Sequence, residues 1–149
     1  MDTDISTQMD HVVKLLQQIL HMQRVSSLSD EQVFRFNVNG ETIHMALPDA
    51  QLDFIQRVTP QTGHFFDASL LSQVAKIDLI GHNKIVYNIG ANIVNHSVYF
   101  ERILGAQTIV SCEPQPHVHK TFQRNLKLNG LATKNAFKVM LGDAAKGHC

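Results

Sequence analysis

The sequence predicts an α/β fold built on a parallel sheet. From Gly81 onward, short apolar runs alternate with amphipathic stretches of about ten residues, which is the rhythm of βαβ units. Upstream, an Asn-Gly pair at positions 39–40 joins two runs whose apolar residues agree in register, which predicts a β-hairpin. A helical pattern at the N-terminus completes the set. Together these observations favour a mixed α/β domain over an all-helical or all-β one.

The composition and charge of the chain limit the kinds of protein and partner that we expect. The 149 residues suffice for one domain with a core, and 44% of them are hydrophobic. Thirteen basic residues balance thirteen acidic ones, so we expect no nucleic acid as a partner. We also expect no membrane contact, because no apolar run approaches the roughly 20 residues of a membrane span.

The same sequence predicts a cytoplasmic protein. Asp2 and Asp4 stand where a signal peptide carries positive charge. Two cysteines without a repeated spacing, Cys112 and Cys149, fit free thiols in a reducing compartment.

Residues 1–28 are expected to form an amphipathic helix. The residues that step along it by four and three are Ile5, Met9, Val12, Leu16 and Ile19, and Val13 and Leu20 widen this stripe. The stripe is shorter than the three or four heptads of a typical coiled coil. Packing on the chain's own domain is the preferred interpretation. A homo-oligomer through this helix is the alternative.

Residues 29–80 are predicted to form a hairpin and a helical lead-in. A two-residue type I′ turn at Asn39-Gly40 places Phe36 opposite Ile43 and Phe34 opposite Met45, so one face is apolar throughout.

Two helices should follow the hairpin. One is expected to open at Pro48 and Asp49 and to run through Val58, because "TPQTGHFF" reads as an interruption. The other is expected from Ala68 to about Lys76, with Asp67 as its N-cap. Its inward residues are expected to be Leu70, Leu71 and Val74.

Residues 81–149 carry the βαβ pattern. The expected strands are 84–88, 107–112 and about 136–141, and the expected helices are 97–104 and 118–128. In a parallel sheet, ligands bind beyond the carboxyl ends of the strands. The first strand ends in the small residues of "VYNIGANIVNH", directly before a helix. Gly90 and Ala91 would leave backbone amides close to a bound group, so this turn is interpreted as a nucleotide platform.

Two acidic residues follow later strands. Glu113 closes the second strand about 20 residues after Gly90, the offset at which a carboxylate grips ribose hydroxyls. Asp143 follows the third strand in "LGD". For both, a solvated strand-end acid remains the alternative. The GxGxxG fingerprint is missing, which disfavours a nicotinamide-linked oxidoreductase.

The blocks "VYNIGANIVNHSVYF", "VSCEP", "NLKLNGL" and "LGD" resemble the FkbM-type group of class I S-adenosylmethionine-dependent methyltransferases, from about His64 to Gly147. The resemblance implies a Rossmann-like sheet whose first three strands have the order 3-2-1. It implies that residues 81–149 are the N-terminal half of the methyltransferase domain. It also implies a cofactor, S-adenosylmethionine, and an acceptor that the sequence does not identify.

The resemblance assigns roles to individual residues. The turn that holds the methionine part of the cofactor corresponds to Asn88, Gly90, Ala91 and Asn92. The position of Glu113 would hold the ribose hydroxyls, and that of Asp143 would face the adenine. No catalytic base is assigned, because much of the acceptor site belongs to strands beyond the third.

The chain departs from the family at two positions and in length. Asn88 stands where the family usually has an acidic residue, and Val94 where it usually has glycine. The family sheet has seven strands, and the chain stops after three. A truncated, catalytically inactive remnant that serves as an interaction module is therefore the alternative.

Two other groups of polar residues are not interpreted as functional sites. His117 and His119 open a helix two positions apart, so they point in different directions and predict no metal site. Lys120, Arg124 and Lys127 are interpreted as a solvated helix face.

Overall fold

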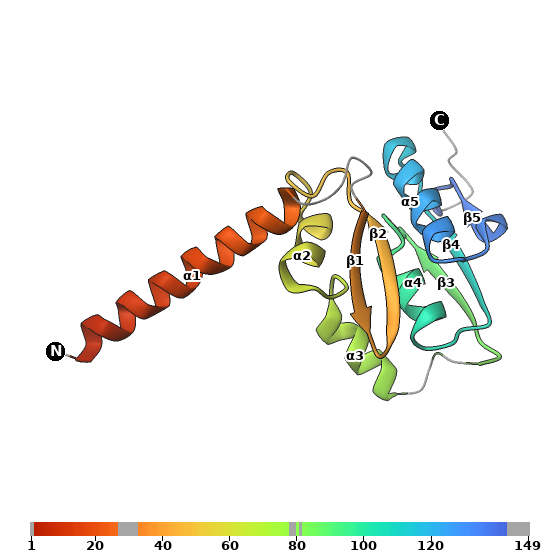
Figure 1. Ribbon diagram of the computed structural model, residues 1–149. Coiled ribbons are helices and arrows are strands. Elements are labelled where there is room, and N and C mark those ends of the chain that lie inside the picture. The colour runs from red at the N-terminus through yellow and green to blue at the C-terminus, as the bar shows by residue number, and fades with distance from the viewer. Residues whose placement is uncertain (1, 27–32, 78–79, 81, 143–149) are drawn as a thin grey trace.

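The computed structural model describes residues 2–26, 33–77, 80 and 82–142. A long N-terminal helix leads to a body that contains a two-stranded antiparallel sheet and a three-stranded parallel sheet (Figure 1). The elements in chain order are α1 (Asp2–Ser26), β1 (Val33–Val38), β2 (Glu41–Ala46), α2 (Phe54–Thr62), α3 (Ala68–Lys76), β3 (Ile85–Ile89), α4 (Asn95–Arg102), β4 (Thr108–Cys112), α5 (Pro116–Leu128), a 3₁₀ turn (Thr133–Asn135) and β5 (Ala136–Phe137).

The parallel sheet confirms the predicted fold class. Its strands lie side by side in the order β3-β4-β5, so each helical connection leads to the next strand of the sheet. This three-stranded parallel sheet with its helical connections is consistent with a Rossmann-like fold. The third strand is shorter than predicted, because only Ala136 and Phe137 pair with β4, and residues 138–142 form no strand.

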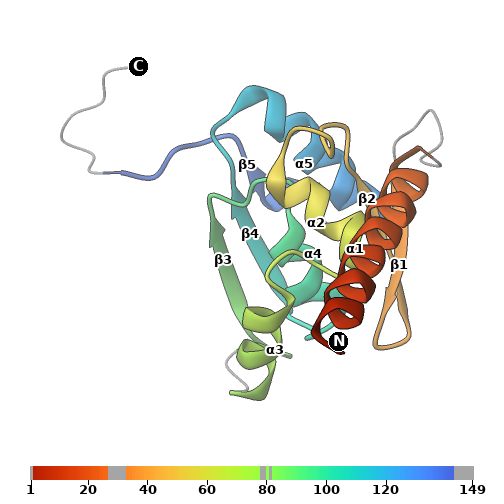
Figure 2. The same cartoon turned by 90° about the vertical axis from the view of Figure 1, so that its left-hand side faces the viewer.

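Within the described part of the chain, helices cover one face of this sheet and leave the other open. On β4, Ile109 and Ser111 are 6% and 2% exposed, and they face α4. Side chains alternate between the two faces along a strand. The opposite face, here called the open sheet face, consists of Ile85, Tyr87, Ile89, Thr108, Val110, Cys112 and Phe137. Its three β3 residues are 59%, 68% and 61% exposed, and Figure 2 shows α4 and α5 on the other side of the sheet.

The hairpin forms as predicted. Asn39 and Gly40 both have positive φ, 51° and 85°, as a type I′ turn requires. The observed register pairs Phe36 with Ile43 and Phe34 with Met45. Ile43 and Met45 are fully buried and belong to the same hydrophobic core as the α4 and α5 side chains.

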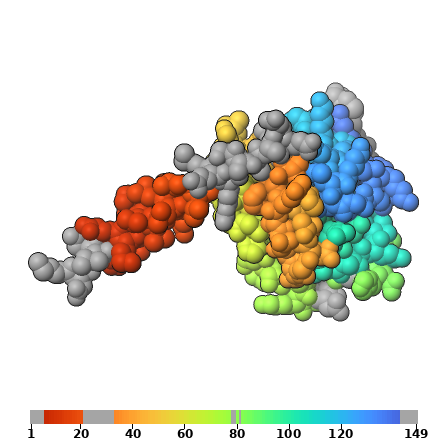
Figure 3. Space-filling view, in the orientation of Figure 1, coloured from red at the N-terminus to blue at the C-terminus, as the bar shows by residue number. Residues whose placement is uncertain are grey.

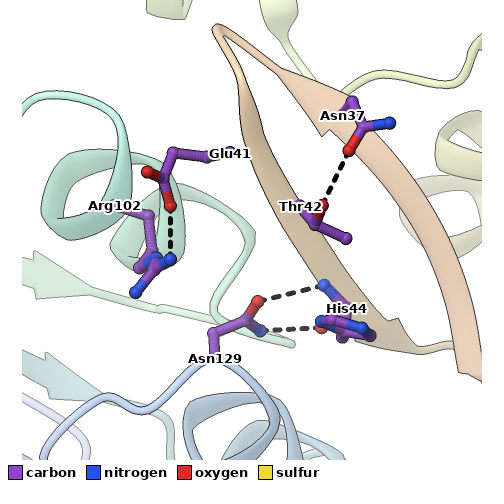
Figure 4. Close-up of polar contacts among 6 residues, drawn as sticks. All are labelled: Asn37, Glu41, Thr42, His44, Arg102 and Asn129. Carbon is purple, nitrogen blue, oxygen red and sulfur yellow. Dashed lines mark hydrogen bonds and ion pairs between the residues drawn. The ribbon is translucent and has the colours of Figure 1, made fainter.

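Asn125 of α5 and Asn129, the residue that follows α5, attach this hairpin to the rest of the body. In an antiparallel ladder, alternate residues turn their N–H and C=O groups away from the partner strand. On β2 these residues are His44 and Ala46. Asn129 accepts from the His44 N–H at 3.0 Å and donates to its carbonyl at 2.7 Å, as Figure 4 shows. Asn125 makes the same pair of bonds with Ala46 at 2.6 and 3.2 Å. The edge of β2 is thus satisfied by helix side chains instead of a third strand.

The helix predicted from Pro48 to Val58 was wrong in its bounds. Residues 48–52 form turns, and α2 begins only after Asp53, whose carboxylate accepts from the Gln56 N–H at 2.8 Å. The helix then continues through Pro60, which is buried. Gly63 ends it at φ 69° and donates to the Thr59 carbonyl. Proline so close to the C-terminus removes one hydrogen bond without breaking the helix.

The helix predicted at residues 68–76 is confirmed with Asp67 at its N-cap position, but the side-chain capping bond and part of the inward face are not. Asp67 has φ 58° and makes no side-chain capping bond. Leu71 is buried, whereas Leu70 is 52% exposed. The apolar face is therefore narrower than the sequence indicates.

The predicted packing of α1 on its own domain was wrong for the side chains that the structure describes, residues 6–20. Every one of them is exposed. Figures 1 and 3 show α1 projecting from the body, with contacts to α2 at its base. Lys14, Gln17 and Gln18 line one shallow cleft together with Gln61 of α2, so the polar side of α1 faces the body.

Candidate functional site

The candidate site lies where β3 and β4 end. The turn 90–94 joins β3 to α4, and Glu113 follows β4 directly. Because parallel strands end at the same edge of a sheet, the structure brings together Asn88, Gly90, Ala91, Asn92 and Glu113. Asp143 lies outside the described residues.

The turn has an unusual backbone. Gly90, Asn92 and Val94 all have positive φ, at 72°, 48° and 63°. A β-carbon added to Gly90 would meet no atom within 4 Å, so the space in front of this residue is open. Glycine is thus required here by backbone conformation, and its small size keeps an open approach to the turn.

The chain itself satisfies the amides that follow Gly90. Ala91 donates to the Cys112 carbonyl at 2.9 Å, and Val94 donates to the Ala91 carbonyl at 2.8 Å. The Ile93 N–H donates to the side-chain oxygen of Asn92 at 2.7 Å. These internal bonds hold the turn in shape without a ligand. They also mean that the Ala91 amide is not directed at a ligand. The expectation that this amide lies close to a bound group was therefore wrong.

Glu113 is the centre of the site. It is 3% exposed, and one carboxylate oxygen accepts from the Asn92 N–H at 3.0 Å while the other accepts from the Gln115 N–H at 2.9 Å. Its own N–H donates to the Phe137 carbonyl on β5. Glu113 therefore joins the ends of all three strands, a structural role that sequence reasoning missed. A carboxylate has about four acceptor sites, and these two bonds occupy two of them.

Asn88 points to the helix-covered face of the sheet. Its side-chain nitrogen donates to the Ser97 hydroxyl at 2.8 Å, and that hydroxyl shares a 2.8 Å hydrogen bond with Ser111. This chain of polar groups connects β3, α4 and β4. Ser97 and Ser111 were not predicted to matter, although hydroxyls at positions expected to be buried were a signal that each needs a partner.

Val94 is the N-terminal flanking residue of α4 and is fully buried. Its side chain belongs to the hydrophobic core. The side-chain atoms that Val94 has and glycine lacks therefore lie in the hydrophobic core.

A second polar cluster surrounds the start of α4. The Asn95 side chain accepts from the Phe66 N–H and donates to the Phe66 carbonyl, both at 3.0 Å. The His96 ring stacks near Phe66, and its Nε2 atom lies 3.8 Å from an Asp67 carboxylate oxygen. Burial lowers the pKa of His96 below the ordinary value of 6.5, and the Asp67 charge offsets part of that effect.

Other features of the described residues bear on alternatives. No group of three His, Cys, Asp or Glu side chains is close enough to hold a metal within this part of the chain. His119 instead stacks on Phe122 at 4.9 Å, and Cys112 is a buried free thiol. Among the described helices, none combines the length and hydropathy that crossing a bilayer requires.

The chain has only low similarity to known proteins. No protein-family model and no curated protein matches the chain. Among solved structures, it is similar to M. jannaschii TYW2 in complex with AdoMet, with 13% identity and a TM-score of 0.48 over 75% of this chain and 44% of that one. It is also similar to P. horikoshii TYW2 in complex with MeSAdo, with 14% identity and a TM-score of 0.47 over 78% of this chain and 39% of that one. The chain spans less than half the length of either protein. Because the identities and TM-scores are low, we take no function from these similarities.

Proposed function

We propose that this chain is the cofactor-binding part of an S-adenosylmethionine-dependent methyltransferase of the FkbM type. The observation that carries the proposal is the position of Glu113, a buried carboxylate at the end of β4 that lies against the open turn after β3. In a parallel sheet this is the edge at which nucleotides bind.

The residues present fit the cofactor in three respects. The open space at Gly90 admits a group above the turn. The two remaining acceptor sites of Glu113 match the two hydroxyl donors of a ribose. The negative charge of Glu113 also favours a cationic ligand. The proposed roles are the methionine part beside Asn88 and Gly90–Asn92, the ribose at Glu113 and the adenine near Asp143.

The chemistry would be direct transfer. The cofactor, when bound, supplies a methyl group on a cationic sulfur to an acceptor nucleophile whose identity is open. The part of this chain would be to hold and orient the cofactor, because positioning is its main means of lowering such a barrier. The proposed setting is the reducing cytoplasm, in which Cys112 persists as a thiol.

Calorimetric titration with S-adenosylmethionine and with its demethylated product tests the proposal. We expect both to bind, and we expect Glu113→Gln to weaken binding by about tenfold or more, because it removes a charge-assisted acceptor. The matched control is Glu101→Gln on α4, away from the strand ends. The absence of heat up to millimolar ligand, from a folded sample, would contradict cofactor binding.

Two further outcomes are informative. Unchanged affinity in Glu113→Gln would remove this residue from the site. Heat with a nicotinamide dinucleotide and none with S-adenosylmethionine would favour the oxidoreductase that the missing glycines disfavour.

A second candidate function belongs to a different class. The projecting helix α1 with its exposed apolar residues favours an interaction module, in which a catalytically inactive remnant forms a homo-oligomer through this helix. Light scattering of the chain with and without residues 1–28 separates the candidates. An unchanged monomer in both samples would exclude assembly through α1.

A further inference from the structure

The exposed surface of α1 is a wide apolar stripe, which we define as Met9, Val12, Val13, Leu15, Leu16, Ile19 and Leu20. These side chains are between 44% and 64% exposed, and none is among the buried core residues of the described chain. At 100° per residue the stripe spans an arc of about 160°, wider than a globular surface helix needs to face its core. An exposed patch of this kind marks an interaction surface.

The body of the same chain does not cover the stripe. Lys14 lies opposite the middle of the stripe on the helical wheel, and it lines the cleft shared with Gln61 of α2. The stripe therefore faces away from α2. Figures 1 and 3 show α1 extending beyond the body, so the partner must come from outside the described chain.

The distribution of charge along α1 selects the partner and its orientation. The first ten residues contain Asp2, Asp4 and Asp10 and no Lys or Arg. Residues 11–26 contain Lys14 and Arg24 and no acidic residue. A second copy in the antiparallel direction brings its acidic end against the basic end of the first, whereas a parallel copy brings like charges together. Antiparallel helix dipoles add to this preference.

We propose that α1 pairs antiparallel with α1 of a second copy, with the apolar stripe as the shared interface. The proposal rests on the second candidate function above and adds the orientation of the two helices and the side chains that form their interface. The contact is isologous, so it closes as a dimer. The heptad-like steps of Met9, Val12, Leu16 and Ile19 supply the side chains that interdigitate between the two helices.

The first experiment uses two adjacent positions with the same change. Leu16→Glu puts a charge in the stripe, and Gln17→Glu puts it outside the stripe, about 100° around the helix from Leu16. Light scattering over a concentration series is expected to give a dimer for the wild-type chain and for Gln17→Glu, and a monomer for Leu16→Glu. Circular dichroism checks that all three are folded. A monomeric wild type, or equal effects of the two substitutions, would overturn the proposal.

The second experiment tests the orientation by exchange of charge. Asp2 and Arg24 lie on the same side of the stripe on the helical wheel, and they are separated by about 33 Å along one helix, so they do not interact within a chain. Asp2→Lys and Arg24→Glu are each expected to weaken the dimer by about two- to fivefold, and the double variant should recover most of that loss. Losses that simply add would contradict the antiparallel arrangement, because only opposed helices bring these positions together.

A third variant tests whether the apolar stripe packs on the open sheet face of another copy instead of on its α1. Tyr87→Lys alters the open sheet face, and we expect it to leave the dimer intact. If it dissolves the dimer as Leu16→Glu does, the stripe packs on the sheet of another copy and the helix pair is excluded. Titration of Leu16→Glu with S-adenosylmethionine keeps the two proposals independent, since loss of the dimer is expected to leave cofactor binding unchanged.

Discussion

At the scale of single residues, Val94 combines two opposed effects. Its φ of 63° is a conformation that β-branched residues rarely adopt, yet its side chain is fully buried. The left-handed conformation costs about 1–2 kcal/mol, and burial of a valine side chain contributes about 1.5–3 kcal/mol, so the packing outweighs the strain.

This balance predicts an inverted order of stability at Val94. Val94→Ala loses core contacts and keeps most of the strain, whereas Val94→Gly loses slightly more contact and relieves the strain. We expect the glycine variant to be at least as stable as the alanine variant in urea unfolding. The control is Val98, which is equally buried but lies within α4. There the glycine variant should be less stable than the alanine variant by about 1 kcal/mol.

His96 predicts a dependence of stability on pH. Its pKa is lowered in the folded protein, chiefly by burial, so the unfolded chain binds more protons between the folded pKa and 6.5. Stability therefore rises with pH through this window. Below the folded pKa the His96 contribution no longer changes with pH, because His96 is then protonated in both states. We expect the free energy of unfolding to drop more in the wild type than in His96→Gln when the pH falls from about 7.5 to about 5.5. An equal drop in both proteins would assign the effect to other groups.

The location of the candidate residues at the ends of β3 and β4, on one edge of the sheet, was predictable, but the orientations of their side chains were not. The ends of β3 and β4 follow from local pattern, so the sequence placed Gly90 and Glu113 at one edge of the sheet. The N–H groups of the turn need hydrogen-bond acceptors, and the pattern of side chains in the sequence does not indicate which residues provide them. The Glu113 carboxylate accepts the bond from the Asn92 N–H. Its ribose-binding role stays a prediction beside this structural one.

At the scale of elements, the attachment of β2 to α5 depends on few atoms. Asn125 is fully buried and bonds to both backbone groups of Ala46 and to the Ile93 carbonyl at 3.0 Å. Removal of its side chain leaves three buried backbone groups without partners.

We therefore expect Asn125→Ala to lower the free energy of unfolding by about 2–4 kcal/mol. Lys127→Ala, on the exposed side of the same helix, should change it by no more than about 0.5 kcal/mol. Denaturant unfolding of both variants measures the difference. Similar values for the two would mean that water replaces the Asn125 bonds without loss.

Elements defined by local chemistry were predicted best. The Asn39-Gly40 turn sets the hairpin register by itself, so that register was confirmed residue by residue. The start of α2 failed because Pro48 was interpreted as an opening residue and Pro60 as a break, although the capping Asp53 decides the start. The orientation of α1 depends on partners far along the chain or outside it, and no local pattern contains that information.

At the scale of the whole molecule, the two faces of the parallel sheet differ in energy. Ile109 lies under α4 and is 6% exposed, whereas Ile89 lies on the open sheet face and is 61% exposed. Ile109→Ala should cost about 2–5 kcal/mol, and Ile89→Ala less than about 1 kcal/mol. Thermal or urea unfolding of the matched pair checks this. A large cost at Ile89 would show that another chain covers this face in solution.

The amide of Asn125 also touches two parts of the molecule that are distant in sequence. It grips the last residue of β2 with one set of bonds and the turn before α4 with another. A displacement of the hairpin, which contributes no atom to the turn itself, can therefore be transmitted there through one side chain. A partner that binds and displaces the hairpin is therefore expected to alter the proposed cofactor-binding turn through Asn125.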